Sequence, residues 1–299
     1  MIKINNVPFE VKHFPDGTQL LNEFNDELLM MGLHKLTLSY DIVWTYEDDS
    51  EMFTLYCIVN HLRNCHEGPS SITINLVMPY VPNARMDRTH HCSEVFTLKY
   101  FAKFINDLNF NSVSVFDPHS NVSNALFDRL RVKNAILERS VTSSLFIMDG
   151  DDDCDYETTA LYFPDEGAYK RYMGLSAVFD RKVFYGKKVR VWETGEIKGI
   201  DVYNANGEKA TFDDVNGLNI LMIDDIISYG GTLAYSSDIL KSLGANKIYA
   251  YVSHTENSVL DKDKGTFLKR LEDGTIEKLY TTNSIYNGHH KKIELVHEF

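Results

Sequence analysis

The segment Leu221–Thr232 constrains the fold more than any other part of the chain. An apolar run from Leu218 to Ile223 predicts a buried strand, the carboxylates of Asp224 and Asp225 follow, and a glycine-containing loop leads into a helix. Continuous apolar runs are typical of parallel strands that are buried on both faces. In α/β sheets, ligands bind beyond the carboxyl ends of such strands. The segment therefore predicts an α/β domain with a ligand site where this strand ends.

The residues of the loop indicate which ligand it binds. Gly230 and Gly231 let backbone N–H groups approach a phosphate, and the N-terminus of the following helix favours negative charge. Two adjacent carboxylates suit ribose hydroxyls or a hydrated Mg²⁺. Together these features predict a sugar-phosphate site. The alternative, an ordinary strand–turn–helix with glycine in the turn, does not require Asp-Asp and Gly-Gly-Thr at one strand end.

Composition excludes several classes of protein. The chain has 299 residues and a net charge of −13, so it is long enough for two domains and lacks the basic balance of a non-specific nucleic-acid binder. No stretch has the length and apolarity of a membrane span. The four cysteines show no zinc-site spacing, which indicates reduced thiols and a cytoplasmic location.

The chain repeats one plan twice. In each half a strand, a loop, a helix and a second strand follow one another, with polar residues at the strand ends, which predicts parallel sheets with right-handed crossovers. The predicted strands are 71–78 and 112–116 in the first half, and 219–223 and 247–253 in the second. We expect domains at 1–143 and 144–299, and interpret the acidic run 149–155 as a solvated loop, with a metal role as the weaker alternative. Turn signals between residues 187 and 217 predict a β-rich excursion from the second domain.

Four segments together resemble the ribose-phosphate pyrophosphokinases, also called phosphoribosyl pyrophosphate synthetases. They occur in the order typical of that family and are Phe14–Gly17, Met78–Arg88, Phe116–His119, and Phe163–Gly167 with Asp224–Thr232. The chain is similar to a diverged, phage-like member. The resemblance implies an α/β fold of two type I phosphoribosyltransferase-like domains, each with a parallel sheet flanked by helices.

The resemblance also implies a reaction and its partners. The anomeric hydroxyl of a ribose 5-phosphate unit attacks the β-phosphorus of ATP, a diphosphoryl group moves, and AMP leaves, with Mg²⁺ as the cofactor. In phosphoryl transfer the protein mainly positions groups and neutralises charge. The expected functional residues are therefore those that hold phosphates, metal and ribose hydroxyls.

The resemblance assigns ATP to the first domain. Arg85 and Arg88 supply cations for its phosphates, and Asp87 belongs to the same loop. Phe14 stacks on the adenine, and Asp16 accepts a hydrogen bond from its amino group. In the family these two residues enter the site from a neighbouring subunit, which implies a dimer or a larger assembly.

The resemblance assigns the acceptor to the second domain. Asp224 and Asp225 hold the ribose hydroxyls, and the 5-phosphate is surrounded by Ser228, Tyr229, Gly230, Gly231 and Thr232. Asp165 holds Mg²⁺ or the attacking sugar, and His119 of the first domain ligates Mg²⁺ directly or through water. The family's catalytic lysine follows an aspartate in a basic cluster, which makes Lys182 the candidate and Arg181 the other possibility.

The chain departs from the family pattern beside the 5-phosphate. The family has an acidic residue and a threonine where Ser228 and Tyr229 stand. Losing a negative charge and gaining an aromatic ring suits a 5-phosphate that carries a further group, as in ADP-ribose, whose terminal ribose has a free anomeric hydroxyl. Free ribose 5-phosphate, giving phosphoribosyl pyrophosphate, and ADP-ribose, within NAD metabolism, both stay open as acceptors.

Two other classes of function compete with this interpretation. A phosphoribosyltransferase would share Asp224–Thr232 but would not need the Arg85 loop or His119. A non-catalytic regulatory homologue would be expected to lose its metal and phosphate ligands, whereas this chain keeps them at four positions: His119, Asp165, Asp224 and Asp225.

Overall fold

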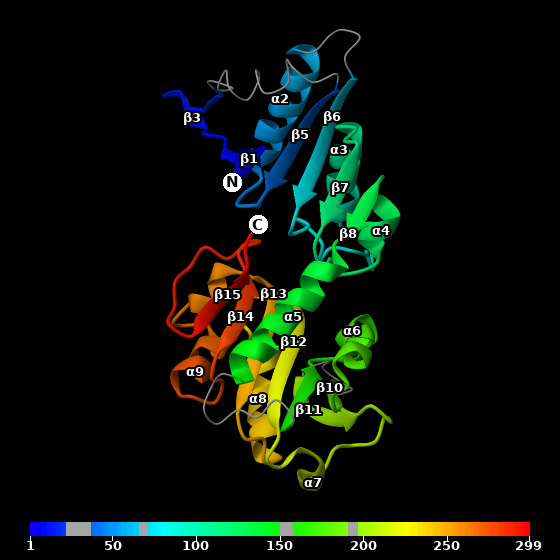
Figure 1. Cartoon of the computed structure of the whole chain (residues 1–299), viewed down its shortest axis with the longest axis vertical. Coiled ribbons are helices and arrows are strands. Elements are labelled where there is room, and N and C mark those ends of the chain that lie inside the picture. Colours follow the sequence, from blue (N-terminus) through cyan, green and yellow to red (C-terminus); the bar gives the residue numbers. More distant parts are fainter. Residues whose placement is uncertain (22–36, 66–70, 150–157, 191–196) are drawn as a thin grey trace. The chain divides into compact units, whose positions relative to one another are not determined.

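The computed structural model describes residues 1–21, 37–65, 71–149, 158–190 and 197–299 (Figure 1). These residues form two compact units, one of residues 1–134 together with Phe299, and one of residues 135–298. The predicted boundary between residues 143 and 144 falls inside helix α5 (Asn134–Asp149), most of which belongs to the second unit. Residues 150–155 of the acidic loop lie outside the described residues.

The first unit contains a six-stranded mixed sheet in the order β2-β1-β5-β6-β7-β8. Strands β5 to β8 are parallel, and β1 pairs antiparallel with β5 and β2. A separate two-stranded hairpin is formed by β3 and β4. In chain order the elements are β1 (Ile2–Ile4), β2 (Val7–Pro8), β3 (Lys12–His13), β4 (Gln19–Leu20), β5 (Thr37–Trp44), α2 (Ser50–Cys65), β6 (Ser71–Met78), α3 (Thr97–Asp107), β7 (Ser112–Val115), α4 (Val122–Leu126) and β8 (Leu130–Val132).

The second unit contains a seven-stranded sheet in the order β11-β10-β9-β12-β13-β14-β15. All neighbours are parallel except β10 and β11, which form an antiparallel pair at one edge. After α5 the elements are β9 (Thr159–Phe163), α6 (Glu166–Phe179), β10 (Val183–Arg190), β11 (Ile197–Asn204), α7 (Phe212–Val215), β12 (Asn219–Ile227), α8 (Gly231–Ser242), β13 (Ile248–Thr255), the 3₁₀ helix η2 (Asn257–Leu260), α9 (Thr266–Glu272), β14 (Leu279–Thr282) and β15 (Ile293–His297).

Apolar side chains cover both faces of the second sheet. Alternate residues of β12 belong to different clusters: Ile220 and Met222 pack with α8 and α9, whereas Leu221 and Ile223 pack with α5 and α6. This alternation follows from the two-residue period of a strand. The sheet is therefore the middle layer of three, which explains the continuous apolar run in the sequence.

The predicted α/β class is confirmed in both units. β6 spans the predicted residues 71–78, and the β-rich excursion is the β10–β11 pair followed by a turn in which Gly207 has φ of 81°. The prediction that the strand ends at Ile223 is wrong, because β12 continues to Ile227. Pairing with β13 extends along these added residues and supplies the backbone partners that keep them in the sheet.

Candidate active site

The two carboxylates occupy adjacent positions of the extended strand β12 and are in contact, since a side-chain hydrogen bond between Asp224 and Asp225 contributes to the raised pKa of Asp224. Asp224 shares a strand face with Ile220 and Met222, whereas Asp225 shares the opposite face with Leu221 and Ile223. Asp225 is buried, and its Oδ1 lies 2.9 Å from Nη1 of Arg171 in α6. The structure thus directs Asp224 to the α8 side of the sheet and pairs Asp225 with a cation on the other side.

Asp224 stands in an environment that disfavours its charge. Burial raises the pKa of this carboxyl well above its usual value, and the negative charges of Asp225 and Asp165 raise it further. Three carboxylates within interaction range repel one another, so a bound cation or hydroxyl donors would favour the ionised form. This is the electrostatic setting expected of a carboxylate that binds a ligand.

The loop from Ser228 to Thr232 is held in place by contacts with α9. Gly230 has φ of 77°, and a Cβ there would lie 2.3 Å from Cβ of Phe267 in α9, so only glycine fits. The Tyr229 carbonyl accepts hydrogen bonds from Phe267 N and Thr266 Oγ1, both at 3.1 Å. These contacts leave the first N–H groups of α8 at the end of β12, where the helix itself provides no acceptors for them.

Asp165 lies at the end of the neighbouring strand β9. Its side chain caps α6 by accepting from Ala168 N at 2.9 Å, and its Oδ2 lies 3.7 Å from Nζ of Lys188. A Cβ at Gly186 would lie 2.5 Å from the Tyr162 hydroxyl and 2.7 Å from the Pro164 carbonyl. Glycine at this position therefore lets β10 approach closely enough for Lys188 to reach Asp165.

The phenol of Tyr162 lies between these groups and α8. Burial raises its pKa, with the charges of Asp165 and Asp224 adding to the effect, so the hydroxyl keeps its proton. The hydroxyl donates a hydrogen bond to Ser236 Oγ at 2.9 Å. This buried hydrogen bond links the end of β9 to α8, close to Asp165 and Asp224.

The structure does not bring Arg181 and Lys182 to this edge. Leu161 N donates to the Lys182 carbonyl at 2.9 Å, which places both basic residues just before β10, at the amino end of the parallel pair β9–β10. The carboxyl end of β10 carries a second basic pair instead, Lys187 and Lys188.

Lys187 and Lys188 are the residues that our sequence analysis missed. Lys187 lies on the α6 side, with Nζ 4.5 Å from the ring centroid of Tyr203 and 3.5 Å from Oε1 of Glu166. Lys188 faces the side of Asp165 and Asp224. The available signal was a Gly-Lys-Lys triplet late in an apolar run, and its meaning depends on the register of β10 with β9.

In the first unit, two loops that follow parallel strands meet. Asp87 is buried, and its oxygens accept from Arg88 Nε at 2.8 Å and Nη2 at 3.2 Å. The Arg88 hydrogen bond lowers the pKa of Asp87 most, and a hydrogen bond from Ser120 and the charge of His119 lower it further. The predicted residues Asp87, Arg88 and His119 are therefore neighbours, while Arg85 of the same loop is exposed.

Phe14 and Asp16 lie on the β3–β4 hairpin. Phe14 N donates to the Thr18 carbonyl at 2.8 Å, and the Phe14 side chain is 48% exposed. Asp16 Oδ1 accepts from Thr18 Oγ1 at 2.7 Å and Thr18 N at 3.0 Å, and these bonds lower the pKa of Asp16 in that order. The hairpin thus presents an aromatic ring and a carboxylate to solvent.

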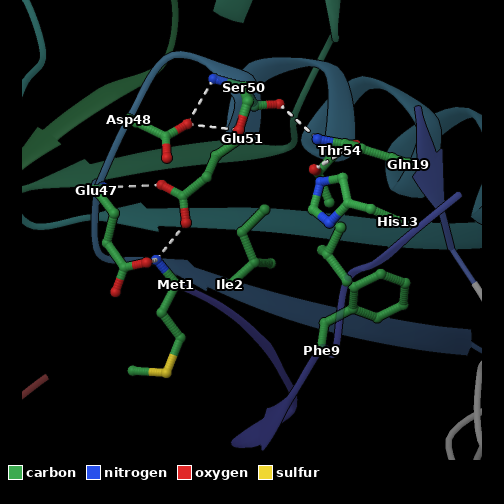
Figure 2. A pocket seen from close by; sticks show the side chains of 11 residues that line it. Met1, Ile2, Phe9, His13, Gln19, Glu47, Asp48, Ser50, Glu51 and Thr54 are labelled. Carbon is green, nitrogen blue, oxygen red and sulfur yellow. Dashed lines mark hydrogen bonds and ion pairs between the residues drawn. The ribbon is translucent and has the colours of Figure 1, made fainter. Parts of the chain in front are cut away.

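Gln19 attaches this hairpin to helix α2 (Figure 2). Its Nε2 donates to the Ser50 carbonyl at 3.2 Å, and its Oε1 accepts from Thr54 Oγ1 at 2.8 Å. The contact closes one side of a cavity of about 400 Å³ lined by Phe9, His13 and the first turn of α2. The two hydrogen bonds of Gln19 therefore help to hold the hairpin against α2.

Within the described ranges, no group of three or more His, Cys, Asp and Glu side chains is arranged to hold a metal ion. In the same part of the chain, no helix is both long enough and apolar enough to cross a membrane.

Comparison with known proteins relates this arrangement to a family. No family model matches the chain. It is 28% identical over 259 residues to the ribose-phosphate pyrophosphokinase of Thermoplasma acidophilum, covering 84% of this chain and 79% of that protein. It is 25% identical over 296 residues to the ribose-phosphate pyrophosphokinase of Thermoplasma volcanium, covering 95% and 89%. The chain is thus similar, over most of its length, to proteins named ribose-phosphate pyrophosphokinase.

A solved structure extends the likeness to the fold. The chain superposes on phosphoribosylpyrophosphate synthetase from Mycobacterium smegmatis with a TM-score of 0.67 and 14% identity, covering 97% of this chain and 85% of that one. The predicted α/β fold is confirmed by this match. The ribose-phosphate pyrophosphokinase resemblance is thus supported by sequence and by fold.

Proposed function

We propose that this chain transfers the diphosphoryl group of ATP to the anomeric hydroxyl of a ribose 5-phosphate unit and releases AMP. The observation that carries the proposal is the edge formed by Asp165, Asp224 and Lys188 beside the Gly230 loop. It combines a phosphate cradle, carboxylates for hydroxyls and metal, and a cation for a transferring phosphate. The names of the relatives support diphosphoryl transfer as the reaction that these groups serve.

The acceptor binds at the carboxyl end of β12 in this proposal. N–H groups at the start of α8, with the Thr232 hydroxyl, hold the 5-phosphate, because a helix N-terminus and a glycine loop favour anions. Asp224 accepts hydrogen bonds from the ribose hydroxyls. Asp225 contributes indirectly, since its ion pair with Arg171 fixes β12 against α6.

ATP binds through the first unit. Arg88 presents a guanidinium whose orientation is set by its bidentate contact with buried Asp87, and Arg85 adds a second cation. Phe14 and Asp16 bind the adenine of a neighbouring subunit's ATP. Their exposure on a hairpin supports this role, which requires a dimer at least.

Lys188 takes the catalytic role that the sequence pattern had suggested for Lys182 or Arg181. Its ammonium lies 3.7 Å from Asp165 and faces the same side of the sheet as Asp224. A cation here stabilises negative charge on the diphosphoryl group as the bond to AMP breaks. Lys187 lies on the other face of β10 and positions the strand through its contacts with Tyr203 and Glu166.

The residues present fit Mg²⁺. Asp165 and Asp224 offer hard oxygen donors whose mutual repulsion a cation would relieve, and Mg²⁺ is commonly held by one or two carboxylates together with substrate phosphates. His119, beside Asp87, supports a second ion through water. When bound, Mg²⁺ neutralises charge on the diphosphate.

A specific observation favours ADP-ribose as the acceptor over free ribose 5-phosphate. Tyr229 is 39% exposed at the phosphate loop, and Nζ of Lys264 lies 5.8 Å from its ring centroid. Asp261 Oδ1 holds the turn that carries Lys264 by accepting from Lys264 N at 2.8 Å. A cation and an aromatic face beyond the 5-phosphate match a second phosphate and an adenine, which free ribose 5-phosphate lacks.

Product analysis by mass spectrometry tests the proposal. ATP and Mg²⁺ are supplied with ribose 5-phosphate or with ADP-ribose, and we expect AMP and a diphosphorylated acceptor in equal amounts. Formation of ADP with a monophosphorylated product refutes the reaction. The absence of any ATP-dependent product would instead support a phosphoribosyltransferase or a regulatory homologue.

A further inference from the structure

A second pocket lies at the opposite end of β10 from the proposed catalytic edge. It has a volume of about 450 Å³ and is lined by Arg181, Lys182, Val183, Phe184, Asn204, Ala205, Asn206 and Asp214. Val183 precedes Lys188 by five residues along one strand, which corresponds to about 17 Å at the rise of a β-strand. One small molecule therefore does not occupy both places.

The fold explains why these residues converge. β11 runs antiparallel to β10 and pairs Asn204 with Phe184, so the turn that follows β11 returns to the amino end of β10. Asn204 Oδ1 accepts from Asn206 N and Glu208 N, both at 3.0 Å, which fixes that turn. The basic pair before β10 and the amides after β11 thus share one rigid edge.

The charge of the pocket is positive in a chain of net charge −13. Arg181 and Lys182 supply two positive charges and Asp214 one negative charge, which leaves one positive charge. The Asp214 carboxylate is already engaged, because its Oδ2 accepts from Thr211 N at 2.8 Å and Thr211 Oγ1 at 2.7 Å. The apolar part of the lining comes from Val183, Phe184 and Ala205.

We propose that this pocket binds a phosphorylated small molecule as a second ligand, separate from the substrates. A guanidinium and an ammonium together match the charge and geometry of a phosphate group. The volume lies within the range of small-molecule sites, and the apolar lining covers the organic part of the ligand. The Asn206 amide is placed to hydrogen-bond that part.

The reactivity of Lys182 toward acetic anhydride, followed by mass spectrometry, tests the proposal at the pocket itself. The probes are orthophosphate, ribose 5-phosphate and AMP, and Lys209, which pairs with Asp201 at 2.7 Å, is the internal reference. At roughly ten times Kd the acylation rate of Lys182 should fall about tenfold, because only the unoccupied fraction reacts. Protection by AMP or ribose 5-phosphate at lower concentration than orthophosphate supports the apolar wall as part of the site.

Two variants make the test specific. Arg181→Gln should raise the protecting concentration about tenfold, the effect of losing one charged hydrogen bond. Asp214→Asn should lower it, because an opposing charge disappears, and a gain of binding is not a consequence of misfolding. Unchanged Lys182 reactivity with all three probes at millimolar concentration overturns the proposal. Protection that both variants leave unaltered also overturns it, and protection by orthophosphate alone overturns the assignment of the apolar wall.

Discussion

Replacing Lys188 by glutamine separates catalysis from stability at the proposed active edge. The ammonium lies 3.7 Å from Asp165, and the two side chains are 27% and 45% exposed. At that distance the Coulomb energy is about 1 kcal/mol in bulk water, and partly exposed pairs typically contribute about 0–1 kcal/mol to stability. Lys188→Gln should therefore change the free energy of unfolding by less than about 1 kcal/mol.

The effect on turnover should be far larger. One preorganised donor to a developing negative charge is typically worth about 100- to 1,000-fold in kcat. The assay is AMP release at saturating ATP and acceptor, with Tm measured on the same samples. Lys278→Gln is the matched control, because Lys278 also lies 3.7 Å from a carboxylate, that of Glu294, with similar exposure.

The two lysine variants should differ sharply in kcat. Lys278→Gln should keep normal kcat, while Lys188→Gln loses it at nearly unchanged Tm. Equal kcat in the two variants, or a loss in Lys188→Gln that tracks a large fall in Tm, would refute the assignment of Lys188.

The surroundings of Asp224, Gln19 and Gly230 give three further predictions. Because the folded-state pKa of Asp224 is raised, ionisation of Asp224 costs stability as the pH rises above the ordinary carboxyl pKa. Without Mg²⁺, the Tm of Asp224→Asn should therefore rise relative to the Tm of the parent between pH 4 and pH 7. A difference in Tm that does not depend on pH would contradict this. Gln19→Leu and Thr54→Val should each release the hairpin from α2 and raise KM for ATP several-fold, with little change in Tm. An unchanged KM in both variants would refute a role of the hairpin in ATP binding. Gly230→Ala should destabilise the chain by more than about 1 kcal/mol, since φ is positive and the added Cβ would lie 2.3 Å from Cβ of Phe267. Gly274→Ala, also at positive φ but with nothing within 4 Å of the added Cβ, should lose less, and equal losses of the two variants in denaturant unfolding would count against the clash.

The same residues distinguish the competing classes of function. A phosphoribosyltransferase uses the phosphate loop at Gly230 but has no need of the Asp87–Arg88 contact beside His119. A regulatory homologue has no need of a lysine beside Asp165. The product analysis and the Lys188 variant together discriminate these classes from the diphosphotransferase.

Local sequence was sufficient for much of the fold. The apolar run from Leu218 to Ile223 identified a buried strand, because a strand covered on both faces has no polar side to display. In the segment 71–78, burial alternates and only Ile74, Leu76 and Met78 are in the core. Gly230 marked the tight loop between β12 and α8, since only glycine is readily accommodated at its φ and its distance from Phe267. These features depend on residues close to one another in the chain.

The tertiary structure decided which residues share the site. The chain offers two basic pairs, at 181–182 and 187–188, and only the pairing of β10 with β9 determines which pair lies at the carboxyl edge. Likewise, only the tertiary structure shows that Asp225 pairs with Arg171 of α6, whereas Asp224 contacts Asp225 and is close enough to Asp165 for that charge to act on it. Strand register and strand length depend on hydrogen bonds between segments far apart in the chain. Local composition determined that this protein would form layered α/β sheets with a tight glycine loop after β12, whereas long-range pairing determined which charges lie near that loop.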